Sequence, residues 1–297
     1  MKKMQNSVQL LQIMRQVFNM KTPACLLYTL LLIGMELVVA DPLVFGVLET
    51  DDPQVMRRRY QPLLESLHET LGIEVVLGLG HSRQEMLENL NDGTFHLGCL
   101  SSSSYVIAKK LFPEKIQLVA SVEKNHREGE EEVAIIVRKD SELKSLQELE
   151  GKRFAFGSYQ TTLSYYLPYY LLRQNGVLAK LESFDTLGAH EEIVAKRVAM
   201  GSYDAGAVSV SIARLYKKHL KTIARSEVIS DSAIVVNRNI DPKVRKLIGS
   251  FFINMDDPSM FRALGKGVTG FVMRSDRDYD RLRKIMEIVD RDSGERP

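Results

Sequence analysis

From Pro42 onward, short runs of apolar and β-branched residues alternate with stretches of helical periodicity. The first three runs, each followed by a helical pattern, are 43–48, 73–77 and 95–100. This alternation is typical of α/β sheets, because two parallel strands need a crossover that is usually a helix. We therefore expect an α/β fold with doubly wound sheets.

The alternation is interrupted once and then starts again. Strand-like runs at 117–122 and 133–138 flank a polar stretch, and a second such pair lies at 222–225 and 233–237. We therefore expect two lobes, with two crossings that form a two-strand hinge. A chain of 297 residues with 44% apolar content can fill two ordinary domains.

We expect one lobe to comprise residues 41–133 and 230–297, and the other to comprise residues 134–229. Open α/β sheets hold ligands beyond the carboxyl ends of their strands. Two such lobes leave a cleft between these ends, where we expect a ligand.

The amino-terminal segment differs from the rest of the chain. An apolar run at 24–40 follows Lys21 and ends in small residues, so we interpret residues 1–40 as an export signal. Met20 is a candidate true start, since a signal of ordinary length begins there. The alternative is an uncleaved membrane anchor, for which seventeen residues that include Glu36 are short.

Charge and motifs exclude several classes of protein. Residues 1–40 hold a net charge of +3, so the formal +2 of the chain leaves −1 for the remainder, with no basic excess to attract nucleic acid. Cys25 would leave with the signal, and Cys99 alone cannot form an intramolecular disulfide. Hydrolase, zinc-protease and P-loop motifs are missing, and the GxGxxG match at 265–270 follows a helical pattern instead of a strand. We expect no enzyme, metal or cofactor.

The segment 151–172 carries the strongest functional signal. Residues 152–156 predict a short buried strand that Gly157 ends. Four hydroxyls then open an apolar helical run, on Ser158, Thr161, Thr162 and Ser164. A helix start carries unpaired N–H groups and a partial positive charge, which suits an oxyanion, although such residues are often plain N-caps. Pro168 should bend this helix, because the carbonyl of Ser164 loses its backbone partner.

Other predicted helix starts lie at the same cleft. His190 begins a helix, and Asp204 stands at the next predicted strand, so a histidine donor and a carboxylate that orients the ligand or His190 are candidates. In the first lobe, Ser102 and Tyr105 belong to a second hydroxyl-rich start and would form the opposing wall. Thr50 belongs to a third predicted helix start, where the neighbouring acidic residues would repel an anion. Capping and turn hydrogen bonds are the simpler interpretation of each.

With these residues in place, the chain resembles the periplasmic substrate-binding proteins of phosphonate, phosphite and phosphate ABC importers. The resemblance covers most of the chain after residue 41. Its most specific blocks are IIVRKDSELKSLQELEGKRFAFGS at 135–158 and GAHEEIVAKRVAMGSYDAGAV at 188–208. It implies a type II periplasmic-binding-protein fold, an exported protein and an importer partner.

Carried over by position, the resemblance also names residues. The family's motif Ser-Thr-Ser-Gly falls on Thr161, Thr162, Leu163 and Ser164, and its histidine and aspartate fall on His190 and Asp204. The third hydroxyl is thus a leucine here. Losing one buried donor costs about 1–3 kcal/mol toward a phosphonate-like head group, unless another group replaces it.

The leading hypothesis is an exported, monomeric, periplasmic protein that clamps a small oxyanion and delivers it to the permease of an ABC importer. The alternative keeps the fold as a sensory module that is read by a membrane sensor kinase. A hydrolase or transferase based on His190 and a nearby serine is least favoured, because no paired base and orienting acid accompany them.

Overall fold

The computed structural model describes residues 41–124, 132–159, 161–188, 190–226, 232–264 and 267–294. The predicted signal at 1–40 lies outside these ranges, as do Gly265 and Lys266 and parts of both stretches where the chain was expected to cross between lobes. In these described ranges, no helix is both long and apolar enough to cross a bilayer.

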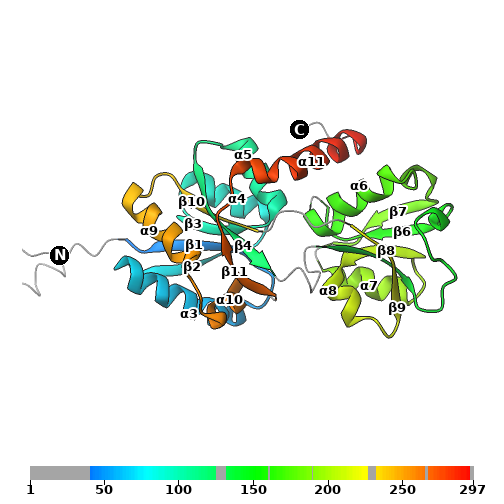
Figure 1. The fold of residues 1–297 in the computed structure, drawn as a ribbon, viewed down its shortest axis with the longest axis horizontal. Helices are drawn as coiled ribbons and strands as arrows, with labels where there is room; N and C mark the ends of the chain where they lie inside the picture. The colour runs from blue at the N-terminus through cyan, green and yellow to red at the C-terminus, as the bar shows by residue number, and fades with distance from the viewer. Residues whose placement is uncertain are drawn as a thin grey trace, which may run out of the picture. The chain divides into compact units, whose positions relative to one another are not determined.

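The first sheet has six strands in the order β11-β4-β10-β3-β1-β2 (Figure 1). They are β1 (Leu43–Leu48), β2 (Val75–Gly80), β3 (Leu97–Leu100), β4 (Ile116–Lys124), β10 (Ala233–Asn237) and β11 (Val268–Val272). Strand β1 runs parallel to β2 and β3, whereas β10 and β11 run antiparallel to their partners.

Helices cover both faces of this sheet. One face is packed by α3 (Pro53–Leu71), α9 (Pro242–Ile253) and α10 (Pro258–Leu264). The other is packed by α4 (Arg83–Asp92), α5 (Ser102–Leu111) and α11 (Asp280–Asp292), which the 3-10 turn η5 (Asp276–Tyr279) precedes. Helix α3 begins where the sequence predicts, because Asp52 caps it and Pro53 fits the first helical position.

The second sheet has five strands in the order β7-β6-β8-β5-β9. They are β5 (Val133–Arg138), β6 (Arg153–Phe156), β7 (Ser183–Thr186), β8 (Ala205–Ser209) and β9 (Leu220–Arg225). One face carries η3 (Thr162–Tyr166) and α6 (Leu167–Gln174), and the other α7 (Glu191–Ala199) and α8 (Val210–Leu215). Short 3-10 turns lie at η2 (Gln147–Leu149) and η4 (Leu178–Lys180).

Strand β5 shows why both faces of the second sheet need cover. Its residues Val133, Ile135 and Val137 belong to one buried apolar cluster, while Ala134 and Ile136 belong to another. Side chains alternate across a strand, so a continuous apolar run is stable only when both faces are buried.

The chain passes from the first sheet to the second between Lys124 and Val133, and returns between Arg225 and Ala233. The predicted fold class, α/β with two doubly wound lobes, is confirmed. The numerical lobe bounds remain a prediction that this assignment of strands supports.

The C-terminal helix α11 packs against both α5 and α6. Just before it, the Tyr279 ring lies 4.4 Å from that of Tyr105, and the Tyr279 hydroxyl is 2.8 Å from that of Ser121. At its far end Asp292 forms an ion pair with Arg173 of α6. The helix therefore contacts elements of both sheets.

Candidate functional site

The hydroxyl-rich turn after β6 is folded back on itself. A Cβ on Gly157 would lie 2.5 Å from the Cβ of Ser164, so only glycine fits there. The N–H of Gly157 donates to the Ser164 carbonyl at 3.0 Å, which is the carbonyl that Pro168 cannot bond. The expected irregularity is thus one π-helical turn, η3, ahead of α6.

The hydroxyls of this turn have different partners. Thr161 Oγ1 donates to the carbonyl of Ser158 at 2.7 Å, which closes the turn locally. Thr162 Oγ1 accepts from the N–H of Ser103, in the other lobe, at 3.0 Å. Ser164 Oγ donates to Glu191 at 2.6 Å. Of these three hydroxyls, that of Thr162 is the one that bonds directly to the other lobe.

Glu191, the first residue of α7, is an internal carboxylate within this site. Besides Ser164, it accepts from the Ser209 N–H at 2.9 Å and from Ser209 Oγ at 2.6 Å. Ser209 is the last residue of β8. Glu191, at the start of α7, therefore accepts from two hydroxyls, those of Ser164 and Ser209, that could otherwise donate to an oxyanion. Sequence reasoning missed both residues, although Glu191 directly follows the candidate His190.

His190 and Asp204 lie in different places. His190 is the exposed N-cap of α7, next to Glu191. Asp204 comes before β8 and accepts from the Arg153 N–H at 2.9 Å. Strands β6 and β8 are parallel and Arg153 begins β6, so Asp204 lies at the end of the sheet opposite to Ser209. Asp204 precedes the first residue of β8, whereas the hydroxyl-rich turn lies at the carboxyl ends of the strands. The structure therefore does not bring Asp204 to the hydroxyls of that turn.

The start of α5 forms the facing half in the first lobe. Ser101 caps the helix and accepts from the Ser104 N–H at 3.3 Å. Ser102 and Ser103 are buried, and the Ser103 N–H reaches Thr162. Both helix starts follow the carboxyl ends of parallel strands, as expected.

Tyr105 does not form the opposing wall. Its hydroxyl donates to Asp276 at 2.9 Å, and its side chain is buried against Tyr279. Burial, with the bond to Asp276, raises the pKa of Tyr105 above its ordinary value. This tyrosine holds the C-terminal segment onto α5 instead.

A cavity of about 250 Å³ opens at the carboxyl ends of β1 and β3. Its polar wall consists of Thr50, Arg59, Arg83, Ser101, Ser104 and Ser232. The apolar part of the wall includes Tyr60, Met86 and Cys99, and burial raises the pKa of the Cys99 thiol to about 12. Thr50 is thus at the site, although its own N–H is used by the Met56 sulfur at 3.4 Å.

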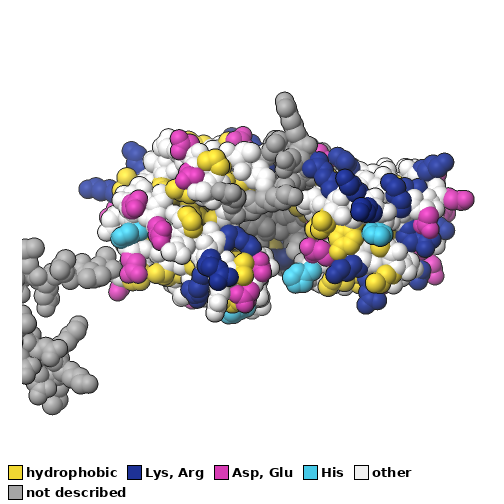
Figure 2. Space-filling model, turned by 90° about the horizontal axis from the view of Figure 1, so that it is seen from below, with side chains coloured by type: hydrophobic (Ala, Val, Ile, Leu, Met, Phe, Trp, Pro, Cys, Tyr) yellow, Lys and Arg dark blue, Asp and Glu magenta, His cyan; other side chains and the backbone are white. Residues whose placement is uncertain are grey.

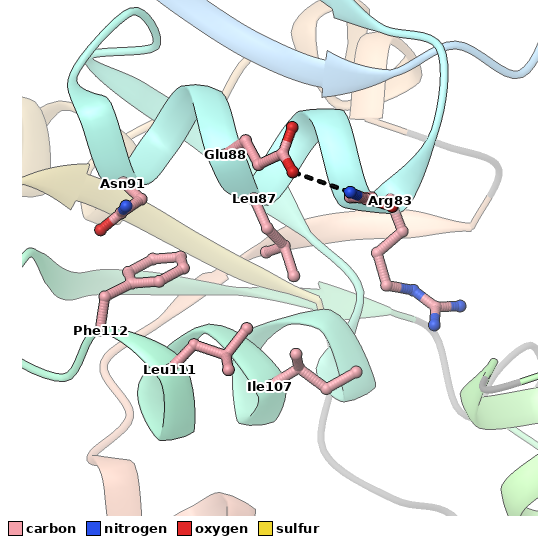
Figure 3. A pocket seen from close by; sticks show the side chains of 8 residues that line it. Arg83, Leu87, Glu88, Asn91, Ile107, Leu111 and Phe112 are labelled. Atoms are coloured by element: carbon pink, nitrogen blue, oxygen red, sulfur yellow. Dashed lines mark hydrogen bonds between the residues drawn. The ribbon is translucent and has the colours of Figure 1, made fainter. Parts of the chain in front are cut away.

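Arg83, the first residue of α4, is a third residue that sequence reasoning missed. Its guanidinium donates to the carbonyl of Tyr159, in the turn of the other lobe, at 3.4 Å. Arg83 also lines a groove of about 490 Å³ between α4 and α5 together with Leu87 and Phe112, and Figure 3 shows its guanidinium pointing away from those two side chains. The only signal for it in the sequence was its place just after the Ser82 cap.

Two other kinds of site find little support among the described residues. No group of three or more histidine, cysteine or acidic residues is placed to hold a metal ion in the part of the chain that the structure describes. On the face in Figure 2, basic side chains (dark blue) are interspersed with acidic ones (magenta), unlike a continuous basic stripe for nucleic acid.

Comparison with known proteins gives a family match. A family model described as "ABC transporter, phosphonate, periplasmic substrate-binding protein" matches residues 45–279. The phosphonates-binding periplasmic protein of Escherichia coli is 24% identical over 222 residues, which cover 71% of this chain. The match spans 65% of that relative's length.

Solved structures share the fold. PhnD1 from Prochlorococcus marinus, in complex with methylphosphonate, is 19% identical with a TM-score of 0.70, over 84% of this chain and 98% of that one. XAC2383 from Xanthomonas citri, bound to ATP, is 20% identical with a TM-score of 0.68, over 85% and 98%. At these identities the likeness establishes the fold alone.

Proposed function

Because the chain belongs to the family of periplasmic substrate-binding proteins of phosphonate ABC transporters, we propose that it binds a small oxyanion between its lobes and delivers it to an importer permease. The curated relative is named for phosphonates, and PhnD1 was solved with methylphosphonate. A phosphonate is therefore the first ligand to test, followed by phosphite and phosphate. The family is one of binding proteins, not of enzymes.

One contact carries this proposal: the hydrogen bond of 3.0 Å from the Ser103 N–H to Thr162 Oγ1. It joins the start of α5 in one lobe to the start of η3 in the other. Helix starts carry backbone N–H groups and a partial positive charge, and this contact brings two such starts together. An oxyanion placed there would be held from both sides.

Magnitudes also favour a site built from both lobes. Three charge-assisted hydrogen bonds at about 1.5–3 kcal/mol each contribute about 5–9 kcal/mol. Association costs about 4–15 kcal/mol in lost translational and rotational freedom. One helix start alone does not offset that cost, so contacts from the facing lobe are needed.

The proposed binding residues come from both halves. In the second lobe they are the hydroxyl turn with Ser158, Thr161 and Thr162, and the exposed His190. Ser164, a candidate from the sequence, donates its hydroxyl to Glu191 instead. In the first lobe they are Ser102, at the start of α5, and Thr50, on the cavity wall. We further propose export to the periplasm and a monomeric state.

Isothermal titration calorimetry of the full chain tests the proposal. Methylphosphonate, phosphite, phosphate and methanesulfonate are titrated, with acetate as a control for charge alone. We expect saturable binding of at least one phosphorus oxyanion and none of acetate. Absence of binding to all four would reject the ligand class.

A deletion strain separates transport from sensing. If the chain serves an importer, its loss abolishes uptake of the oxyanion that calorimetry identifies. Unchanged uptake, together with loss of the transcriptional response to that oxyanion, would favour a sensory module read by a sensor kinase.

A further inference from the structure

Two of the donors that a hydroxyl motif would offer are committed elsewhere in this chain. Position 163 is a leucine, whose side chain packs against the apolar core. Ser164 donates to Glu191, so its hydroxyl binds an internal carboxylate. The second lobe therefore offers fewer hydroxyl donors to a ligand, and the carboxylate of Glu191 brings a negative charge near the turn. An oxyanion bound there needs a positive charge from another side chain.

Arg83 is placed to supply that cation. It stands at the first position of α4, at the carboxyl end of β2, and its side chain crosses to the turn of the second lobe. Its guanidinium donates to Tyr159, the residue after Ser158, and the same side chain lines the cavity beside Ser101 and Ser104. One arginine thus touches both halves of the site.

The contact to Tyr159 is a weak one for a charged donor. At 3.4 Å it is longer than the 2.7–3.2 Å of good N–H···O bonds. Burial also lowers the pKa of Arg83, which means that the surroundings disfavour its positive charge. An oxyanion is a stronger acceptor than a carbonyl and matches the planar guanidinium fork with two bonds.

Arg59 provides an internal comparison on the same cavity wall. Its guanidinium forms an ion pair of 2.7 Å with Asp51, and both side chains are largely exposed. Its charge is therefore balanced within the first lobe and screened by water. Both arginines line this cavity, and Arg83 also reaches the turn of the second lobe.

We propose that Arg83 is a ligand contact that supplies the positive charge for the bound oxyanion. The inference rests on the proposed function, and it assigns a residue that neither the hydroxyl motif nor the family resemblance names. The ligand class is a small phosphorus oxyanion whose head group lies between Arg83 and Thr162.

Calorimetry with methylphosphonate and phosphate on the full chain tests this assignment. Replacing Arg83→Gln should weaken binding by about 10- to 100-fold, the range of a lost charge-assisted bond. Arg83→Lys keeps a point charge without the fork and should lose about 3- to 10-fold. Arg138→Gln, which removes the ion pair with Asp140 outside the cavity, is the control and should change affinity by no more than about twofold. Circular dichroism and the thermal midpoint of each unliganded variant show whether it folds.

The outcomes separate the two proposals. If the native chain binds none of the oxyanions, the proposed function fails. If the native chain binds and Arg83→Gln binds equally well, the assignment of Arg83 is overturned while the function stands. Should Arg83→Gln not fold, Arg83→Lys decides, and affinity equal to that of the native chain would overturn the assignment.

Discussion

The two sheets share the arrangement of their three parallel strands, but the helix that follows the outer strand begins with opposite charges in the two lobes. Each sheet begins with three parallel strands, β2-β1-β3 in one and β7-β6-β8 in the other, and continues with a strand that enters across the hinge. In each lobe a helix follows the outer strand of this trio. Its first residue is Arg83 in α4 and Glu191 in α7.

This difference changes what each lobe offers a ligand. In the second lobe, Glu191 binds Ser164 and Ser209, so these polar groups are satisfied internally. In the first lobe, Arg83 lines a cavity and reaches across to Tyr159. The common topology fixes where the helix starts lie, while single residues in their first turns decide the charge there.

The largest effect tests the internal carboxylate. Glu191→Ala leaves the Ser164 hydroxyl and both donors of Ser209 without their acceptor, and hydrogen bonds to charged groups contribute about 1.5–3 kcal/mol each. We expect the free energy of unfolding to fall by about 3 kcal/mol, measured by urea denaturation. Glu191→Gln keeps an acceptor and should lose less. Equal losses would show that the carboxylate does not organise this lobe.

A smaller effect separates the two threonines of the turn. Thr162→Val removes the acceptor of a buried backbone N–H at Ser103 and should cost about 1–3 kcal/mol of unfolding free energy. Thr161→Val removes a local bond to Ser158 and should cost no more than about 1 kcal/mol. Urea denaturation of both variants makes the comparison. The reverse order of losses would contradict the bridging role of Thr162.

The smallest effect concerns the first lobe alone. Tyr105→Phe keeps the packing against Tyr279 but removes the bond from the hydroxyl to Asp276. We expect a loss of about 1 kcal/mol in the free energy of unfolding. Asp276→Asn keeps an acceptor at that place and is the control. An unchanged stability in Tyr105→Phe would mean that solvent replaces this bond without cost.

Much of the architecture could be predicted because it rests on local patterns. The strands at 43–48, 133–138 and 233–237 have the predicted bounds, since apolar runs between turn residues define them. The hydroxyl turn after β6 was also located, because Gly157 and Pro168 leave the chain little choice there. The helix that was expected to bend begins as a π turn for the same reason.

The partners of the polar side chains could not be predicted from local patterns. Thr162 and Ser103 are 59 residues apart, Arg83 and Tyr159 are 76 apart, and Tyr105 and Asp276 are 171 apart. Periodicity says nothing about such pairs. Asp204 was misplaced for a simpler reason, because a strand boundary shifted by a few residues moves a side chain to the other end of a sheet.

Helix α11 connects the two lobes in addition to the two places where the chain passes from one sheet to the other. It lies on α5 through an apolar face and holds α6 at its tip through the exposed pair of Arg173 and Asp292. Apolar packing is persistent, whereas an exposed ion pair is easily exchanged for water. Helix α11 also contacts η3, where Tyr166 is hydrogen-bonded to Asp290. A rotation of one lobe against the other therefore changes contacts along this helix as well as the ion pair at its end.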